Sequence, residues 1–456
     1  MKAFKAYDIR GVYGRDFDSE TVYRIGFHLP GLLKADSVLV GYDCRESTPD
    51  ILRHLSTGIM DSGSDVLDMG PATTPMVYYA TAAHGMKASV QITASHNPRE
   101  YNGLKISRSG ALPVGYDTGL SELERMVLSG SVQPVAFRGN YEDFPGMKSE
   151  YVSFLSGFME DHSILATGID CSNGMAALIA EEVLGDGPAY IYDSLDGTFP
   201  NHPPNPLEEE NTADLRALVL RDGLDVGVIF DGDGDRVMFV DDRGRFVRPD
   251  IITAVLGLHF LDGESGRVLH DVRTSRGVIR FIEELGGKPF MWKVGHSHAK
   301  MKMRELGAVY GGELAGHYYF RNFFNCDSGM LAAVLVLNIL ASRKSRGMSF
   351  SSLVDSIDIY ANSGEVNFRI EDKITAMNRL KDHFTAAEEP LAIYDFDGYR
   401  IEFPKWWFNI RPSNTEPYLR LVAEAEDRGL LREKMQAIRD IIHEQGGEGQ
   451  GSRTAD

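Results

Sequence analysis

Three segments of the chain repeat one order of predicted elements, and this repeat constrains the fold more than any other feature. Each segment begins with an apolar strand that ends at an acidic residue and continues through a helix to a second strand. The strand pairs are 38–43 and 65–70, 166–170 and 189–192, and 267–271 and 289–292. Such units join parallel strands through right-handed crossovers. The repeat therefore predicts three related α/β domains with largely parallel sheets.

The region after about residue 362 follows a different order of elements: strand, helix, hairpin, strand, helix. Residues 418–425 alternate in polarity, and 430–443 have helical spacing of apolar residues. We expect a smaller α+β domain that closes over the other three. The predicted divisions are 1–140, 141–244, 245–361 and 362–445, followed by a Gly-rich tail, 446–456, that we expect to be disordered.

Composition narrows the classes of protein that fit. A net charge of −19 argues against nonspecific nucleic-acid binding, although a local cluster of basic residues can still bind a small anion. The three cysteines form no CxxC pair, which fits a reducing compartment. The N-terminus has no signal-peptide core, and the longest apolar run, 330–337, is too short for a bilayer and predicts a buried helix. We therefore expect a cytoplasmic protein that contacts neither nucleic acid nor membrane.

A short polar turn, 93–98, follows the apolar run 88–92. It places Ser95 and His96 just after a predicted strand, where we expect the serine hydroxyl to be exposed at a sheet edge. A phosphoryl group could be attached to it or removed there. The alternative is an ordinary turn, in which Ser95 and Asn97 are common turn residues and Pro98 ends the strand.

Asp231, Asp233 and Asp235 follow a predicted buried strand, 226–230. Carboxylates at alternate positions can face the same way and offer hard oxygen ligands to one Mg²⁺ ion. A calcium EF-hand loop is excluded, because Arg236 stands where that loop needs glycine and the flanks are strands. A solvated hairpin would leave the three charges repelling each other, so we predict a metal site whose remaining ligand comes from elsewhere.

Two further loops combine polar groups that suit a sugar phosphate. One has a guanidinium, hydroxyls and an amide, which together fit a phosphate dianion. The other has an acid and a histidine in a Gly-rich turn, which could hold vicinal sugar hydroxyls. Each composition is also common in plain turns, so both interpretations stay open on the loops alone. The residues are Arg411, Ser413, Asn414 and Thr415 in the first loop, and Glu313 and His317 in the second.

Taken together, these segments resemble the α-D-phosphohexomutase superfamily, in particular its phosphomannomutase/phosphoglucomutase branch. Four motifs occur in the expected order, from 7–11 to the Arg411 loop, so the resemblance covers nearly the whole chain. It implies a heart-shaped arrangement of three related α/β domains and a fourth α+β domain. It also implies an intramolecular phosphotransferase that interconverts hexose 1-phosphate and hexose 6-phosphate, of mannose and/or glucose, through a phosphoserine and a hexose 1,6-bisphosphate.

The resemblance assigns a role to each candidate residue. Ser95 would carry the phosphoryl group, and one of its oxygens would join the three aspartates around Mg²⁺. Lys105 is the first candidate for proton transfer, because a lysine held near cations has the depressed pKa that this step needs, and His296 is the second. The other expected catalytic residues are Arg10 and Arg236. The expected substrate-binding residues are Tyr7, His96, Arg273, Lys293, Glu313, His317, Arg411, Ser413, Asn414 and Thr415.

Two positions bear on the substrate. Asn414 is similar to the hexose mutases, whereas phosphoglucosamine mutases usually carry glycine there. Ala315 replaces the serine of the usual Glu-Met-Ser-Gly-His loop, so a hydroxyl contact is missing and the preference between mannose and glucose stays open. The alternatives are a phosphoglucosamine mutase, a Mg²⁺-dependent sugar-phosphate phosphatase and a silent binding protein. We expect hexose phosphates as ligands, a hexose 1,6-bisphosphate as activator, and a monomer or homodimer.

Overall fold

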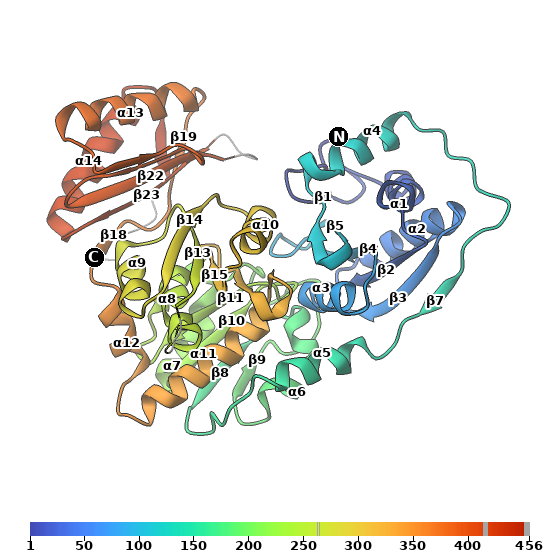
Figure 1. The fold of residues 1–456 in the computed structure, drawn as a ribbon, viewed down its shortest axis with the longest axis horizontal. Coiled ribbons are helices and arrows are strands. Elements are labelled where there is room, and N and C mark those ends of the chain that lie inside the picture. The colour runs from blue at the N-terminus through green and yellow to red at the C-terminus, as the bar shows by residue number, and fades with distance from the viewer. Residues whose placement is uncertain (262, 264, 414–417, 451–456) are drawn as a thin grey trace.

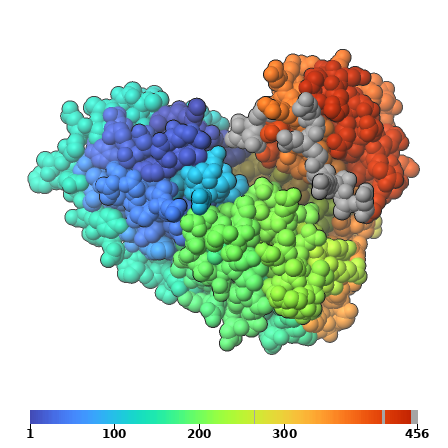
Figure 2. Space-filling view, turned by 180° about the vertical axis from the view of Figure 1, so that it is seen from behind, coloured from blue at the N-terminus to red at the C-terminus, as the bar shows by residue number. Residues whose placement is uncertain are grey.

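Four β-sheets follow one another along the chain, and we call the parts that contain them domains I to IV. The structure is a computed structural model, and it describes residues 1–261, 263, 265–413 and 418–450. Domains I and IV form two lobes above domains II and III, which gives the predicted heart-shaped outline (Figures 1 and 2). No helix in these ranges combines the length and the hydrophobicity needed to cross a membrane.

Domain I contains a seven-stranded sheet in the order β1-β5-β4-β2-β3-β7, with β6 beside β5. Strand β2 is parallel to both β3 and β4, as the repeat predicts, and β5 is antiparallel to β4. The pairing of β7 with β3 extends this sheet past residue 140, where we expected the domain to end. The elements are β1 Ile9–Val12, α1 Ser19–Leu33, β2 Ser37–Tyr42, α2 Thr48–Asp61, β3 Asp65–Pro71, α3 Thr74–Ala83, β4 Ala88–Ile92, β5 Tyr101–Arg108, β6 Leu112–Pro113, α4 Leu120–Ser129 and β7 Tyr141–Asp143.

Domain II repeats this plan on a smaller scale. Its sheet has the order β12-β11-β10-β8-β9, and the parallel strands β9, β8 and β10 are followed by an antiparallel pair. Residues of β10 and β11 are all buried, because the sheet is covered on both faces. The elements are α5 Met147–Ser156, β8 Thr167–Asp170, α6 Ala180–Leu184, β9 Ala189–Ile191, α7 Ala213–Asp222, β10 Val226–Phe230, β11 Val237–Asp241 and β12 Phe246–Val247.

Domain III has a sheet in the order β14-β13-β15-β16-β17. The apolar run at 330–337 lies in α11, whose first thirteen residues are all buried, as an all-round apolar helix must be. One hydrophobic cluster joins domains II and III with α3 of domain I. The elements are α8 Pro249–Phe260, β13 Arg267–Asp271, α9 Arg276–Glu284, β14 Lys288–Trp292, α10 His296–Leu306, β15 Tyr310–Gly312, β16 Tyr318–Phe320, β17 Cys326–Asp327, α11 Gly329–Lys344 and α12 Phe350–Ile357.

Domain IV has its own core, between the sheet β20-β21-β22-β23-β19-β24 and the helices α13 and α14. Strand β18 pairs with β23. We expected the tail to be disordered from residue 446, but residues 448–450 form strand β24 against β19. Residues 451–456 lie outside the described ranges. The elements are β18 Ala361–Asn362, β19 Val366–Arg369, α13 Lys373–Ala387, β20 Ala392–Tyr394, β21 Tyr399–Glu402, β22 Trp406–Pro412, β23 Tyr418–Ala425, α14 Arg428–His443 and β24 Glu448–Gln450.

Polar contacts join domain IV to domain III. Arg400 is fully buried and donates to the backbone oxygens of Val272 and Thr274, both at 2.8 Å. Arg276 donates in the other direction, to the Phe403 oxygen at 2.7 Å. These hydrogen bonds connect two domains whose hydrophobic cores are separate.

Candidate active site

Ser95 lies at the start of the loop between β4 and β5. We expected its hydroxyl to be exposed at a sheet edge, and this expectation is wrong. Strand β4 is an interior strand, and Ser95 is 1% exposed because domain II covers the loop. Its Oγ donates to Asp231 Oδ2 at 2.9 Å, and His96 Nδ1 lies 3.4 Å from the same Oγ. Burial, with Arg236 and Arg10 nearby, holds the pKa of His96 well below its usual range. The serine therefore faces the predicted metal loop.

Asp231, Asp233 and Asp235 lie in the turn between β10 and β11, and all three are fully buried. One oxygen of each lies within 4.8 Å of the others. Burial raises the pKa of Asp231 well above its usual value, and Asp233 and Asp235 raise it further. Oδ1 of Asp233 and of Asp235 has no hydrogen-bond partner among the described residues. Buried, unpartnered carboxylate oxygens beside a hydroxyl are a donor set that fits Mg²⁺.

Lys105, on β5, contacts the same carboxylates. Its Nζ lies 2.6 Å from Oδ2 of Asp233 and 2.6 Å from Oδ2 of Asp235. Burial alone would lower the pKa of Lys105, but these two carboxylates outweigh it and raise the pKa above its ordinary value. The depressed pKa that we expected is therefore wrong here, because the nearest charges are anions and not cations.

Two arginines lie on either side of the serine loop. Arg10, on β1, donates to Asn97 Oδ1 at 2.8 Å and pairs with Asp8. Arg236, just after the metal loop, places its Nε 3.8 Å from Asp231 Oδ2 and 3.9 Å from Asp235 Oδ1. Nε of each guanidinium is buried without a hydrogen-bond partner among the described residues, so each has a donor available to a bound anion.

Domain III contributes two histidines, His296 and His317, to the candidate active site. His296 begins α10, and its ring centroid lies 5.8 Å from that of His317. Nδ1 of His317 lies 2.6 Å from Oδ2 of Asp327, whose Oδ1 lies 2.7 Å from Lys300 Nζ. Burial holds the pKa of His296 well below its usual range, and Lys300 lowers it further. His296 is therefore a neutral imidazole at neutral pH.

The side chain of Glu313 holds the predicted sugar loop through two hydrogen bonds. Glu313 Oε1 accepts from the Gly295 amide at 2.6 Å, and Oε2 accepts from the Tyr319 hydroxyl at 2.5 Å. The hydroxyl of Tyr7 lies 3.4 Å from the Val294 oxygen. Burial, with the charge of Glu313, raises the pKa of Tyr7 to about 12. Tyr7 of domain I thus reaches the loops of domain III.

The predicted phosphate loop lies in domain IV, and the structure describes two of its four predicted residues. Arg411 belongs to strand β22, and Asn414 and Thr415 fall outside the described residues. Glu365 joins three arginines, because its carboxylate lies 3.1 Å from Arg273, 3.4 Å from Arg411 and 3.2 Å from Arg420. Arg273 comes from domain III, so this cluster spans the two domains.

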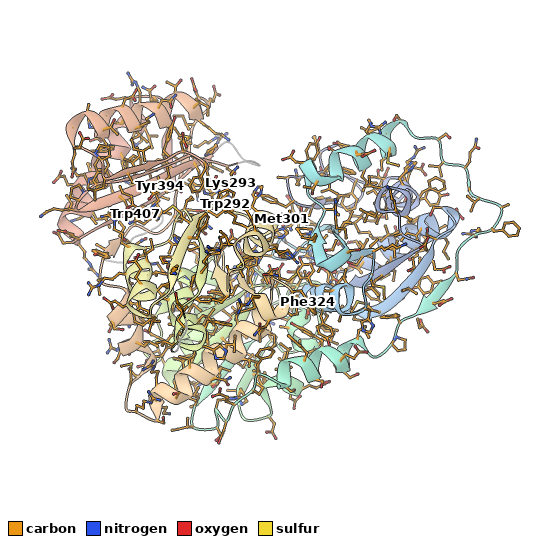
Figure 3. All side chains as sticks on the ribbon, in the orientation of Figure 1. Trp292, Lys293, Met301, Phe324, Tyr394 and Trp407 are labelled. Atoms are coloured by element: carbon orange, nitrogen blue, oxygen red, sulfur yellow. The ribbon has the colours of Figure 1, made fainter. Side chains whose placement is uncertain are left out.

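Lys293 follows β14, at the side of domain III that approaches domain IV (Figure 3). Its neighbour Trp292 stacks on Phe396 of domain IV with ring centroids 5.6 Å apart. Ser413, the remaining predicted residue of the phosphate loop, donates its amide to the Tyr418 oxygen at 2.9 Å. Among the described residues, Lys293, Arg411 and Ser413 form no hydrogen bond or ion pair with Ser95 or with the three aspartates, so the structure does not join them to the serine cluster.

Several functional contacts have no local signature, and sequence reasoning missed them. Thr74 Oγ1 donates to Asp233 Oδ2 at 2.5 Å across the boundary of domains I and II. Lys300 and Asp327 form a buried pair that only the fold brings together. Arg45 could have been found from the sequence, because Asp43-x-Arg45 of the first repeat recurs as Asp271-x-Arg273 in the third. The structure therefore adds five residues to the candidate site: Arg45, Thr74, Lys300, Asp327 and Glu365.

Known families and solved structures match nearly the whole chain. Four segments match the phosphoglucomutase/phosphomannomutase family: its α/β/α domains I, II and III at 1–131, 149–244 and 248–360, and its C-terminal domain at 365–441. A phosphomannomutase of Escherichia coli (strain K12) is 35% identical over 97% of this chain and 99% of its own. A protein of Xanthomonas campestris pv. campestris (strain B100) described as "Phosphohexose mutases" is also 35% identical, over 97% and 99%. The solved structure of a phosphoglucomutase/phosphomannomutase family protein from Burkholderia thailandensis has a TM-score of 0.86 at 28% identity, covering 98% of both chains.

Proposed function

This chain belongs to the phosphoglucomutase/phosphomannomutase family and is a mutase, an isomerase; from that premise we propose that it interconverts hexose 1-phosphate and hexose 6-phosphate. The proposed substrates are the phosphates of mannose and/or glucose. The proposed route passes through phosphorylated Ser95 and a hexose 1,6-bisphosphate. A cytoplasmic location and a monomeric or homodimeric state belong to the same proposal.

One observation carries this proposal. The Ser95 hydroxyl lies 2.9 Å from Asp231, inside a buried group of three carboxylates whose charge the single ammonium of Lys105 does not balance. A hydroxyl buried beside cation ligands suits attachment and removal of a phosphoryl group. A serine that only forms a turn does not require burial against a cluster of carboxylates, so the turn alternative does not explain this arrangement.

The metal-site residues and the two arginines have distinct tasks in the proposal. Asp231, Asp233 and Asp235, with Ser95, would hold Mg²⁺, which when bound offsets negative charge on the transferring group. Arg10 and Arg236 orient that group, since guanidinium pairs well with phosphoryl oxygens. Positioning and electrostatics of this kind account for most catalysis of phosphoryl transfer.

Proton transfer from the sugar hydroxyl needs a base, and the structure favours His296 over Lys105. Lys105 is held in its charged form by two carboxylates, whereas His296 is neutral. In the described part of the chain, Nδ1 of His296 has no hydrogen-bond partner, so this atom is free to accept a proton. Lys105 then serves to balance the charge of the metal loop.

Before its other phosphate can return to Ser95, the bisphosphate intermediate must reverse its orientation in the site without dissociating. Arg411 and Ser413, with Asn414 and Thr415, would grip the phosphate that is not reacting. Glu313 and His317 would hold the sugar hydroxyls in either orientation. The separate core of domain IV would allow that domain to move as a unit during this step.

The experiment is a turnover assay with glucose 1-phosphate, mannose 1-phosphate and glucosamine 1-phosphate, each with Mg²⁺ and a catalytic amount of glucose 1,6-bisphosphate. We expect the 6-phosphate of mannose and/or glucose as product, with little inorganic phosphate. Net phosphate release without isomer would favour the phosphatase alternative. Preferred turnover of the glucosamine phosphate would favour a phosphoglucosamine mutase.

A further inference from the structure

Arg45 lies directly beneath the Ser95 loop and uses every donor that its guanidinium has. Nη1 donates to the oxygens of Pro98 at 2.7 Å and Tyr101 at 3.0 Å. Nη2 donates to the oxygens of Ser95 at 2.8 Å and Asn97 at 2.7 Å. Nε lies 3.1 Å from Asp43 Oδ2 and donates the fifth bond. An arginine has five N–H donors in a fixed plane, so this group is saturated by one loop and one acid.

Arg45 is itself held in place from three sides. Its own amide donates to Asp43 Oδ1 at 3.0 Å, and the Thr48 hydroxyl donates to the same oxygen at 2.8 Å. The ring of Phe199, from domain II, lies 4.9 Å from the guanidinium carbon. Gly197 packs so closely that a Cβ there would lie 2.5 Å from the Arg45 Cα. The guanidinium and the backbone of Arg45 are therefore both in contact with domain II.

The conformation of Ser95 explains why such a support is needed. Its φ is +52°, in the left-handed region that non-glycine residues rarely adopt. Residues held there are strained, and their surroundings must maintain the conformation. The carbonyl oxygen of Ser95 is directed at Arg45, and its side chain is directed at Asp231. Holding the carbonyl thus fixes the backbone at Ser95 and the direction of its Cα–Cβ bond, and the hydrogen bond to Asp231 then orients the hydroxyl.

The third repeat has a corresponding Asp-x-Arg pair, Asp271 and Arg273, next to another loop of the site. Arg273 donates its amide to Asp271 Oδ1 at 2.7 Å and its Nη2 to Asp271 Oδ2 at 2.6 Å. Asp271 Oδ2 also accepts from the amide of Leu314, in the sugar loop, at 2.8 Å. In both repeats, an Asp-x-Arg pair at the end of the first strand contacts a loop of the site, through the arginine in the first repeat and through the aspartate in the third.

We propose that Arg45 is a positioning residue for phosphoryl transfer, which aims the Ser95 hydroxyl at the metal loop without touching the substrate. This inference rests on the proposed function of Ser95. Lysine cannot replace it, because an ammonium has only three donors and no planar fork. Misplacement of a reacting group by about 1 Å costs on the order of 100-fold in rate. The effect should therefore appear in the chemical step and not in sugar-phosphate binding.

The test compares the full-length protein with Arg45→Lys and with a control, Arg304→Lys. Arg304 also donates to backbone oxygens, of Lys300, Gly110 and Phe324, but contacts no residue of the serine loop. Three quantities are measured: the initial rate at which glucose 1,6-bisphosphate phosphorylates Ser95, kcat and KM for hexose 1-phosphate, and the unfolding temperature. The unfolding temperature shows whether each variant is folded.

For Arg45→Lys we expect Ser95 phosphorylation and kcat to fall ~100-fold with KM changed less than ~3-fold, whereas Arg304→Lys keeps both rates near wild type. A folded Arg45→Lys with wild-type rates, or an equal loss in Arg304→Lys, would overturn the inference. If Arg45→Lys does not fold, Asp43→Asn keeps the guanidinium and loosens its support, and an unchanged kcat there would overturn it equally. If the wild-type protein is never phosphorylated at Ser95, the proposed function fails as well.

Discussion

Nζ of Lys105 lies 2.6 Å from Oδ2 of Asp233, across the boundary of domains I and II. The two side chains are buried, and the lysine contacts Asp235 equally closely. A buried charge is costly without a partner, so the lysine and the metal loop depend on each other. The electrostatics of the site follow from this pairing.

Replacing Lys105 by methionine should destabilise the metal-free protein. Removing one partner of a buried ion pair costs about 3–5 kcal/mol, because it leaves uncompensated charge. Mg²⁺ should recover part of this loss by binding the same carboxylates. Thermal unfolding with EDTA and with Mg²⁺ measures both effects. Lys87→Met is the control, since its ion pair with Asp36 is exposed and should contribute little.

Asp231→Asn should have the opposite effect on the metal-free protein. The raised pKa of Asp231 shows that the site disfavours its charge, so the neutral amide relieves repulsion. We expect a higher unfolding temperature in EDTA than for wild type, together with loss of activity and of any stabilisation by Mg²⁺. Wild-type protein at 100 times the Kd of Mg²⁺ should gain about 2.7 kcal/mol. A variant that Mg²⁺ stabilises as much as wild type would contradict the metal assignment.

The repeat, the three aspartates and the serine turn could be predicted because each has a local pattern of residues. The burial of Ser95 could not, because it depends on domain II packing against a loop of domain I. The charge environment of Lys105 was predicted with the wrong sign for the same reason. Arg45 acts through backbone oxygens, which every residue has, so no side-chain motif marks its targets. Lys300 and Asp327 are paired only by the fold of domain III.

Glu365 should make the contact of domains III and IV sensitive to acid. Burial would raise its pKa, but Arg273, Arg411 and Arg420 outweigh burial and lower the pKa below the ordinary 4.5. A carboxylate with a lowered pKa stabilises the folded state above the unfolded value and loses this effect as the pH falls through the folded value. Thermal unfolding from pH 7 to pH 3 should therefore show a weaker acid dependence in Glu365→Gln. Identical pH dependence in both proteins would contradict the assignment.

Ala315→Ser tests the missing hydroxyl of the sugar loop. Ala315 follows Glu313 and Leu314 in a loop that Asp271 and Gly295 hold in place, so a serine there should add one hydrogen bond without moving the backbone. A hydrogen bond contributes about 0.5–1.5 kcal/mol net, or roughly 2- to 12-fold. We expect a change of that size in the ratio of kcat/KM for mannose 1-phosphate and glucose 1-phosphate. Ala308→Ser, in a different part of domain III, would cost stability but leave that ratio unchanged.

Transfer of a labelled phosphoryl group to Ser95 tests the central claim most directly. The protein is incubated with ³²P-labelled glucose 1,6-bisphosphate and Mg²⁺, digested and mapped, and a second sample is chased with unlabelled glucose 1-phosphate. We predict label on the peptide that contains Ser95, its release into hexose phosphate during the chase, and neither label nor turnover in Ser95→Ala. Label on another residue, or near-normal turnover by Ser95→Ala, would contradict the account.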